Sequence, residues 1–274
     1  MTFDVTKEEF NTYKPRGSLR LLLILVRLGF GFGKLKKLLS KAIKNINGEH
    51  PIDIIYHQLN LRVFPHNNTI ESKMLVSSKL REAKELSFIE PFIKGGGTFV
   101  DIGANIGYYS LMAAKLGAKT VLSIEPNPIV LNRFKLNISF NNYGHIIQSI
   151  QMGVGEKQGL LELNVSELDM GSSSVIHSVK VGDKKITIEV DLLENILSKA
   201  NIKNIDVLKI DIEGFEDRAL FPFFQNLDKN QYPKLILMED SSQGGWKRNI
   251  LEWLLANGYR ELGRTRGNVI ITTK

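Results

Sequence analysis

The chain of 274 residues contains no cysteine, which excludes disulfide bonds, thiolate metal ligands and cysteine nucleophiles. That absence suits a reducing compartment such as the cytoplasm. Acidic residues are missing between positions 11 and 48, although this stretch holds nine Lys and Arg. Long apolar runs are missing too, because the most apolar segment, 19–33, is only 15 residues long and contains Arg20 and Arg27. A membrane span needs about 20 apolar residues, so none is predicted here.

The net charge of +7 is concentrated in an N-terminal arm, residues 1–48. Residues 1–10 carry a net charge of −2 and residues 11–48 a charge of +9, which leaves residues 49–274 neutral. Basic residues alternate with leucines over 16–44, a pattern typical either of peripheral contact with an anionic membrane or of a helix packed on the domain. Both interpretations stay open. We expect a cytoplasmic protein, with contact at the inner face of the cell membrane under the first interpretation.

The stretch around which the chain is organised is 98–110. An apolar, β-branched run enters it, a turn with Gly103 and Gly107 follows, and a helical pattern leaves it. This layout is typical of the first strand, ligand loop and helix of an α/β sheet. Asp101 precedes the first glycine by two residues, so the spacing is D-x-G-x-x-x-G and differs from the dinucleotide motif. An acid there suits the ammonium and sulfonium of S-adenosylmethionine and would repel the pyrophosphate of NAD.

A second acid supports a nucleoside site. The apolar run 120–124 ends in Glu125, which lies 24 residues after Asp101. In nucleotide-binding α/β folds, an acid about 20 residues beyond the glycine turn meets the ribose. The sequence therefore predicts an α/β fold with a nucleoside bound across two adjacent strand ends.

Three blocks of sequence resemble the FkbM-type methyltransferases. They are Asp101-Ile102-Gly103-Ala104-Asn105-Ile106-Gly107-Tyr108-Tyr109-Ser110, Ile124-Glu125-Pro126-Asn127-Pro128 and Leu208-Lys209-Ile210-Asp211-Ile212-Glu213-Gly214-Phe215-Glu216. The resemblance extends from about residue 52 to the C-terminus. It implies a class I, Rossmann-like methyltransferase fold with a mostly parallel seven-stranded sheet, an antiparallel C-terminal hairpin and an N-terminal helical and β extension. It also implies S-adenosylmethionine-dependent O-methylation of a hydroxyl on a sugar, glycan, lipid-linked or natural-product acceptor.

Three segments are predicted. Residues 1–48 form the arm, 49–97 form a strand pair and a helix at 78–94 before the core, and 98–274 form the S-adenosylmethionine-binding methyltransferase domain. Beyond the first two core strands, we expect helices at 126–140 and 246–257 and strands at 146–152, 159–165, 185–190, 206–210, 234–238, 259–264 and 268–272.

The candidate cofactor-binding residues come from the glycine turn, from the loop after the second strand and from the exit of the third strand. They are Asp101, Gly103, Ala104, Asn105, Gly107, Glu125, Pro126, Asn127 and Val154. Val154 is the candidate adenine contact because this fold places backbone against adenine there. The glycines beside it are equally typical of a plain turn.

Methyl transfer to a hydroxyl needs a group that removes a proton. Carboxylates lie at the ends of the fourth and fifth core strands, and Asp211, Glu213 and Asp240 are the catalytic candidates, with Glu239 beside them. We favour a carboxylate base without a metal; a divalent metal held by these acids, or helix capping by them, stays open. His177, near a serine-rich loop at 169–174 that is a candidate lid, is a further candidate base, and Lys209 is either a salt-bridge partner or a substrate contact.

Two other functions compete with O-methylation. A protein-directed methyltransferase would use the same cofactor loop with an open, acidic acceptor groove. A membrane-associated, non-catalytic module would have the nucleotide-binding fold without catalytic activity. The presence of all four acids, Asp101, Glu125, Asp211 and Glu213, argues against this alternative. Nucleic acid is not an expected partner, because the basic residues lack interleaved polar side chains that could read bases.

Overall fold

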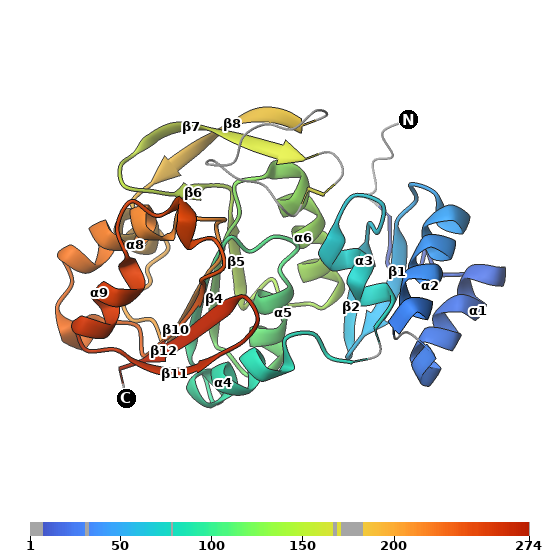
Figure 1. Ribbon diagram of the computed structural model, residues 1–274, viewed down its shortest axis with the longest axis horizontal. Helices are drawn as coiled ribbons and strands as arrows, with labels where there is room; N and C mark the ends of the chain where they lie inside the picture. The colour runs from blue at the N-terminus through green and yellow to red at the C-terminus, as the bar shows by residue number, and fades with distance from the viewer. Residues whose placement is uncertain (1–7, 31–32, 78, 167–168, 171–182, 274) are drawn as a thin grey trace.

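The central sheet is the frame of the protein, shown in the computed structural model of Figure 1. The structure describes residues 8–30, 33–77, 79–166, 169–170 and 183–273. Within these ranges the sheet has seven strands, in the spatial order β11 (Arg260–Arg264), β12 (Asn268–Thr272), β10 (Leu235–Glu239), β9 (Val207–Ile210), β3 (Thr98–Ile102), β4 (Thr120–Ile124) and β5 (Ile147–Ile150). Neighbours from β10 to β5 are parallel, whereas β12 is antiparallel to both β10 and β11. The predicted class I fold with its antiparallel C-terminal hairpin is confirmed.

Helices cover both faces of the sheet because its strands are apolar on both sides. Phe99 belongs to one core and its neighbour Val100 to the other, as the alternation of a strand requires. On the first face lie α4 (Ala83–Ile93), α5 (Tyr108–Lys115) and α6 (Pro128–Phe140); on the second lie α7 (Leu193–Lys199), α8 (Glu216–Gln225) and α9 (Ile250–Ala256). Figure 1 shows α8 and α9 on one side of the strands and α5 and α6 on the other.

The order of the strands creates a switch point. From β3 the chain continues on one side into β4, while β9 lies on the other side of β3, so the loops after β3 and β9 diverge. Ligands of open α/β sheets bind at such a point. A second sheet with the order β6 (Gly153–Val154), β8 (Asp183–Asp191) and β7 (Gly159–Ser166) lies at the top of Figure 1.

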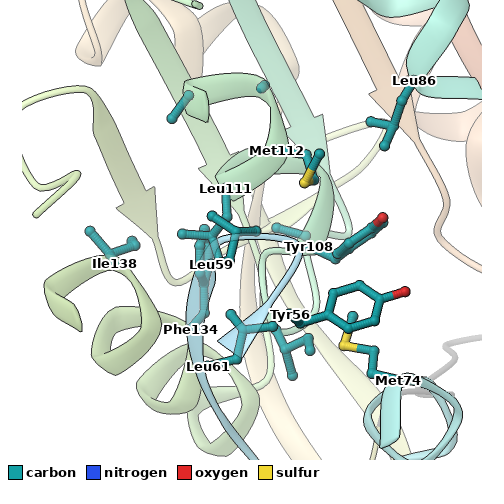
Figure 2. Close-up of a cluster of buried hydrophobic side chains, with 14 of the residues drawn as sticks. Tyr56, Leu59, Leu61, Met74, Leu86, Tyr108, Leu111, Met112, Phe134 and Ile138 are labelled. Atoms are coloured by element: carbon teal, nitrogen blue, oxygen red, sulfur yellow. The ribbon is translucent and has the colours of Figure 1, made fainter. Parts of the chain in front are cut away.

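A hairpin of β1 (Ile52–Tyr56) and β2 (Leu59–Val63) covers the outer side of α5 and α6. Figure 2 shows Leu59 and Leu61 close to Leu111 and Phe134, with Tyr56 beside Met74. Met74 belongs to α3 (Thr69–Leu75), a helix that sequence reasoning missed, as it missed α7. The hairpin therefore extends the first core outward.

The arm folds into α1 (Gly17–Leu25), the π-helical turn η2 (Val26–Phe30) and α2 (Gly33–Asn47), at the right edge of Figure 1. The chain before α1 is tied to the hairpin by Asp53, which accepts from the Tyr13 N–H (3.0 Å) and pairs with buried Arg62 (2.8 Å). Every helix in the described ranges is too short or too polar to cross a bilayer.

Two predicted helices begin later than expected. The helix predicted from residue 246 starts at Ile250, because the Asn249 side chain accepts from the Glu252 N–H (3.0 Å) and caps it there. In the second segment, α4 begins at Ala83 rather than at 78. The turns η3 (Lys229–Gln231) and η4 (Gln243–Gly245) are short 3₁₀ segments between the larger elements.

Candidate functional site

A cavity of about 240 Å³ opens at the carboxyl ends of β3, β4 and β9. Its walls come from the loops after these strands, from the three-stranded sheet and from α3. Of the predicted residues, those that line it are Gly103, Ala104, Asn105, Glu125, Pro126, Val154, Asp211 and Glu213. Asp101, Gly107, Asn127 and Asp240 do not line it. The structure thus gathers most of the candidates from three separate blocks around one space.

The glycines of the turn are required by protein packing as well as by any ligand. Gly103 has φ +74°, and a Cβ there would lie 2.0 Å from the carbonyl oxygen of Asp211. Gly107 has φ +80°, and its Cβ would overlap the ring of Phe134. These positions need glycine because the turn after β3 packs tightly against the loop after β9 and against α6.

Glu125 links the turn to the loop after β4. One carboxylate oxygen accepts from the Asn105 N–H and the other from the Asn127 N–H, each at 2.8 Å. Burial raises the pKa of Glu125 to about 7 against the opposing effect of these two hydrogen bonds. Because a carboxylate oxygen has two lone pairs, each oxygen keeps acceptor capacity toward the cavity. Asn127 itself caps α6 by accepting from the Ile129 N–H (3.1 Å).

Asp101 lies beneath the cavity, fully buried, and its charge is met by the protein itself. The Lys209 ammonium is 3.2 Å from one Asp101 oxygen, and the Ser110 hydroxyl donates to the other (2.6 Å). Lys209 also donates to the Gly103 carbonyl (2.7 Å). Burial alone would lower the pKa of Lys209, but the carboxylates of Asp101 and Asp211 outweigh burial and raise it. Asp101 therefore pairs with Lys209 and does not line the cavity, and Lys209 is a salt-bridge partner at the cavity wall; a contact of Asp101 with the ligand stays a prediction.

Carboxylates gather where β9 and β10 end, and Asp211, Glu213 and Glu239 are called the acid cluster below. Burial, followed by the charges of Asp211 and Glu239, raises the pKa of Glu213 to about 7. Burial and then Asp211 raise the pKa of Glu239 to about 7, although the Ser241 and Ser242 hydroxyls donate to its carboxylate. Burial and mutual repulsion therefore favour the protonated form of Glu213 and Glu239 over a wider pH range than for an ordinary glutamate.

Asp240 does not belong to the acid cluster. Its carboxylate accepts from the Arg264 guanidinium of β11. The ion pair points Asp240 toward the C-terminal hairpin, whereas the neighbouring Glu239 ends β10 itself. Asp240 is thus held in an ion pair and does not line the cavity, and its catalytic role stays a prediction.

Glu216 holds the loop that carries Asp211 and Glu213, a role that sequence reasoning missed. One of its oxygens accepts from the Ile212 N–H (2.9 Å) and the Gly214 N–H (3.3 Å), and the other from the Trp246 indole (2.7 Å). Glu213 has φ +56° within this loop. The signal for this role is an acid in the first turn of a helix, at the end of the third block.

The outer wall of the cavity comes from the segment before the core. The Asn68 side chain caps α3 and donates to the Asn105 side chain (3.2 Å), and Asp169 accepts from the Thr69 N–H (3.0 Å). The lining residues that sequence reasoning missed include Thr69, Ile70 and Lys73, all on α3. Of the serine-rich loop, Asp169 and Met170 are described and line the cavity, whereas His177 and the rest lie outside the described residues.

No group of three or more His, Asp or Glu among the described residues is arranged to hold a metal ion. The acid cluster offers oxygen ligands, but its members do not converge in that way.

Comparison with known proteins gives matches of three kinds: a family model, curated relatives and solved structures. A family model described as the methyltransferase FkbM domain matches residues 101–261. A ribosomal protein L11 methyltransferase of Clostridium perfringens is 30% identical over 138 residues, which cover 47% of this chain and 40% of that protein. The chain thus spans less than half the length of the curated relatives it matches.

Solved structures also match. The methyltransferase FkbM of Methylobacillus flagellatus KT has a TM-score of 0.45 at 16% identity, covering 92% of this chain and 58% of that one. The M. capricolum TrmK complex with S-adenosyl-homocysteine has a TM-score of 0.39 at 13% identity, covering 69% of this chain and 68% of that one.

Proposed function

Because this chain belongs to the FkbM family of methyltransferases, with S-adenosylmethionine as its methyl donor, we propose that it methylates a hydroxyl oxygen. The acceptor class we propose is a sugar, glycan, lipid-linked or other natural-product hydroxyl. The observation that carries the proposal is the acid cluster, in which Glu213 and Glu239 have pKa values near 7, beside the cavity wall formed by Gly103–Asn105 and Glu125.

The residues of the cavity suit the cofactor. Glu125 has acceptor capacity for the two ribose hydroxyls, and apolar side chains including Ile124, Met152 and Val154 offer a surface for the adenine ring. Asp211 provides negative charge at the end of β9, where it suits an ammonium or a sulfonium. When bound, S-adenosylmethionine supplies an electrophilic methyl group.

The chain's own part in the reaction is to orient the acceptor and to take its proton. We assign proton removal to Glu213, because a carboxylate with a pKa near 7 is partly ionised at neutral pH and is basic enough to accept a proton there. Asp211 is the second candidate base. Glu239, which does not line the cavity, would act through its charge, which helps to raise the pKa of Glu213.

The acceptor would enter past α3. Thr69, Ile70 and Lys73 face the cavity from residues 49–97, while the cofactor residues belong to 98–274. We therefore propose that the catalytic domain is 98–274 and that 49–97 forms the acceptor side of its mouth.

The test is a transfer assay with methyl-labelled S-adenosylmethionine and separated glycan, lipid and protein fractions from cells. We expect label in glycan or lipid-linked material, in a linkage that survives mild alkali, because a methyl ether resists hydrolysis that releases methanol from a methyl ester. Failure of the protein to bind S-adenosylmethionine in calorimetry would overturn the proposal, and so would label confined to alkali-labile esters.

Protein methylation is the second candidate. It is favoured by the 30% identity to a ribosomal protein L11 methyltransferase, although the match spans under half of either chain. An acid cluster could also accept a lysine ammonium. In the same assay, label recovered on protein in acid-stable N-methyl-lysine would select this candidate over O-methylation.

A further inference from the structure

The helix α1 carries two apolar stripes, of which the fold uses one. Leu19 and Leu23 of α1 are buried in the core that contains the hairpin, and Val26 at the start of η2 is buried too. Leu21 (59% exposed), Ile24 and Leu28 (70% exposed) follow at helical spacings of three and four and face solvent. One exposed leucine is ordinary on a protein surface, but a second periodic stripe is not explained by packing within the chain.

The helix α2 also exposes apolar side chains. Leu39 and Ile43 are buried, whereas Leu35, Leu38 (64% exposed) and Ile46, which lie beside them on the same broad apolar face, remain exposed. The two helices contact each other at the edge of the molecule, beyond the hairpin (Figure 1). The six residues Leu21, Ile24, Leu28, Leu35, Leu38 and Ile46 are called the outer stripes below.

The charge of the arm distinguishes between two partners that could cover the outer stripes, a second copy of the chain and a lipid surface. Residues 11–48 carry nine basic and no acidic residues, while residues 49–274 are neutral. Arg20 and Arg27 on the first helical stretch and Lys37 and Lys41 on α2 are exposed. Such a surface repels a second copy of itself, whereas anionic headgroups above hydrocarbon complement both its charge and its apolar side chains.

We propose that the N-terminal arm docks the protein peripherally on an anionic lipid bilayer, with the outer stripes inserted at the headgroup boundary and the Lys and Arg side chains among the headgroups. The binding is independent of the methyl-transfer reaction. Each basic residue near an anionic surface strengthens binding roughly fivefold, and each leucine transferred into hydrocarbon by roughly tenfold or more.

The experiment is flotation of the full-length protein with vesicles of phosphatidylcholine alone and with vesicles of equal parts phosphatidylcholine and phosphatidylglycerol. We expect binding to the mixed vesicles only, weakened at about 1 M salt, where the screening length falls to about 3 Å. The variant Leu28→Glu/Leu38→Glu should bind more weakly by about 100-fold or more, and Lys37→Gln/Lys41→Gln by about 25-fold.

Leu160→Glu is the matched control, because Leu160 is 67% exposed on β7, away from the arm. It should bind as the unchanged chain does. Thermal melts should show that all variants fold, since the substituted side chains are exposed. The proposal is overturned by no flotation of the unchanged chain, by equal flotation of the arm variants, or by binding to phosphatidylcholine alone. Self-association that Leu28→Glu/Leu38→Glu abolishes would also overturn it, by making the outer stripes an interface between copies.

Discussion

Replacing Glu213 by glutamine should remove activity and stabilise the fold at the same time. In the folded chain, burial and the nearby Asp211 and Glu239 raise the pKa of Glu213 from 4.5 to about 7. The folded state therefore holds the proton more tightly than the unfolded state does, and the free energy of unfolding falls as pH rises from about 4.5 to 7. Glutamine cannot ionise, so the free energy of unfolding of the variant does not fall with pH in this way.

The magnitude follows from the same pKa values. At 1.36 kcal/mol per pKa unit, the change corresponds to about 3 kcal/mol, and partial exposure of the side chain reduces this to roughly 1.5 kcal/mol. Above pH 7, Glu213→Gln should thus melt about 3 to 6 °C higher than the unchanged chain, and near pH 4.5 the two should coincide. Turnover should fall by roughly 10²- to 10⁴-fold, because the base is lost.

The assay combines thermal melts at several pH values with pH profiles of kcat/KM. For the unchanged enzyme, kcat/KM should rise with pH and reach a plateau above about 7. For the variant, this rise should be absent. Glu189→Gln, at an exposed position on β8, is the control and should change stability by less than about 0.5 kcal/mol at any pH. Near-normal turnover of Glu213→Gln would refute the assignment of the base, and an unchanged melting temperature at pH 8 would refute the electrostatic reasoning.

Three further predictions test the surroundings of the site. Glu125→Gln should weaken S-adenosylmethionine binding in calorimetry by roughly 10- to 100-fold, because an amide cannot accept from both the Asn105 and Asn127 N–H groups; unchanged affinity would remove Glu125 from the site. Gly103→Ala should lower the free energy of unfolding, measured with denaturant, by more than about 2 kcal/mol, because its Cβ would lie 2.0 Å from the Asp211 carbonyl oxygen. Gly159→Ala, where a Cβ meets open space, is the control and should be nearly neutral; equal effects would contradict the packing argument. Lys209→Met should destabilise the protein by about 3 to 5 kcal/mol by leaving Asp101 charged, buried and unpaired, and adding Asp101→Asn should recover part of that loss; no recovery would mean that the pair does not act as a unit.

Local sequence was sufficient for the central strands and the glycine turn. The run from Thr98 to Ile102 is mostly apolar and is buried on both faces, as in a sheet covered on both sides, and Gly103 marks where the strand must turn. Strand ends then follow from local pattern, without long-range contacts. The resemblance to a known fold adds the order of the strands, and together they predict that Gly103, Glu125, Asp211 and Glu213 are neighbours.

Other roles were decided by the tertiary structure, because they depend on which side chains meet across distant parts of the chain. Asp101 precedes the glycine turn as a ligand-binding acid would, yet Lys209, 108 positions later, lies beside it and neutralises it. Asp240 follows a strand as Asp211 does, but the C-terminal hairpin brings Arg264 to it. A charge in a sequence has no partner until the fold supplies one, and burial together with that partner determines whether a carboxylate holds the structure or remains available for chemistry.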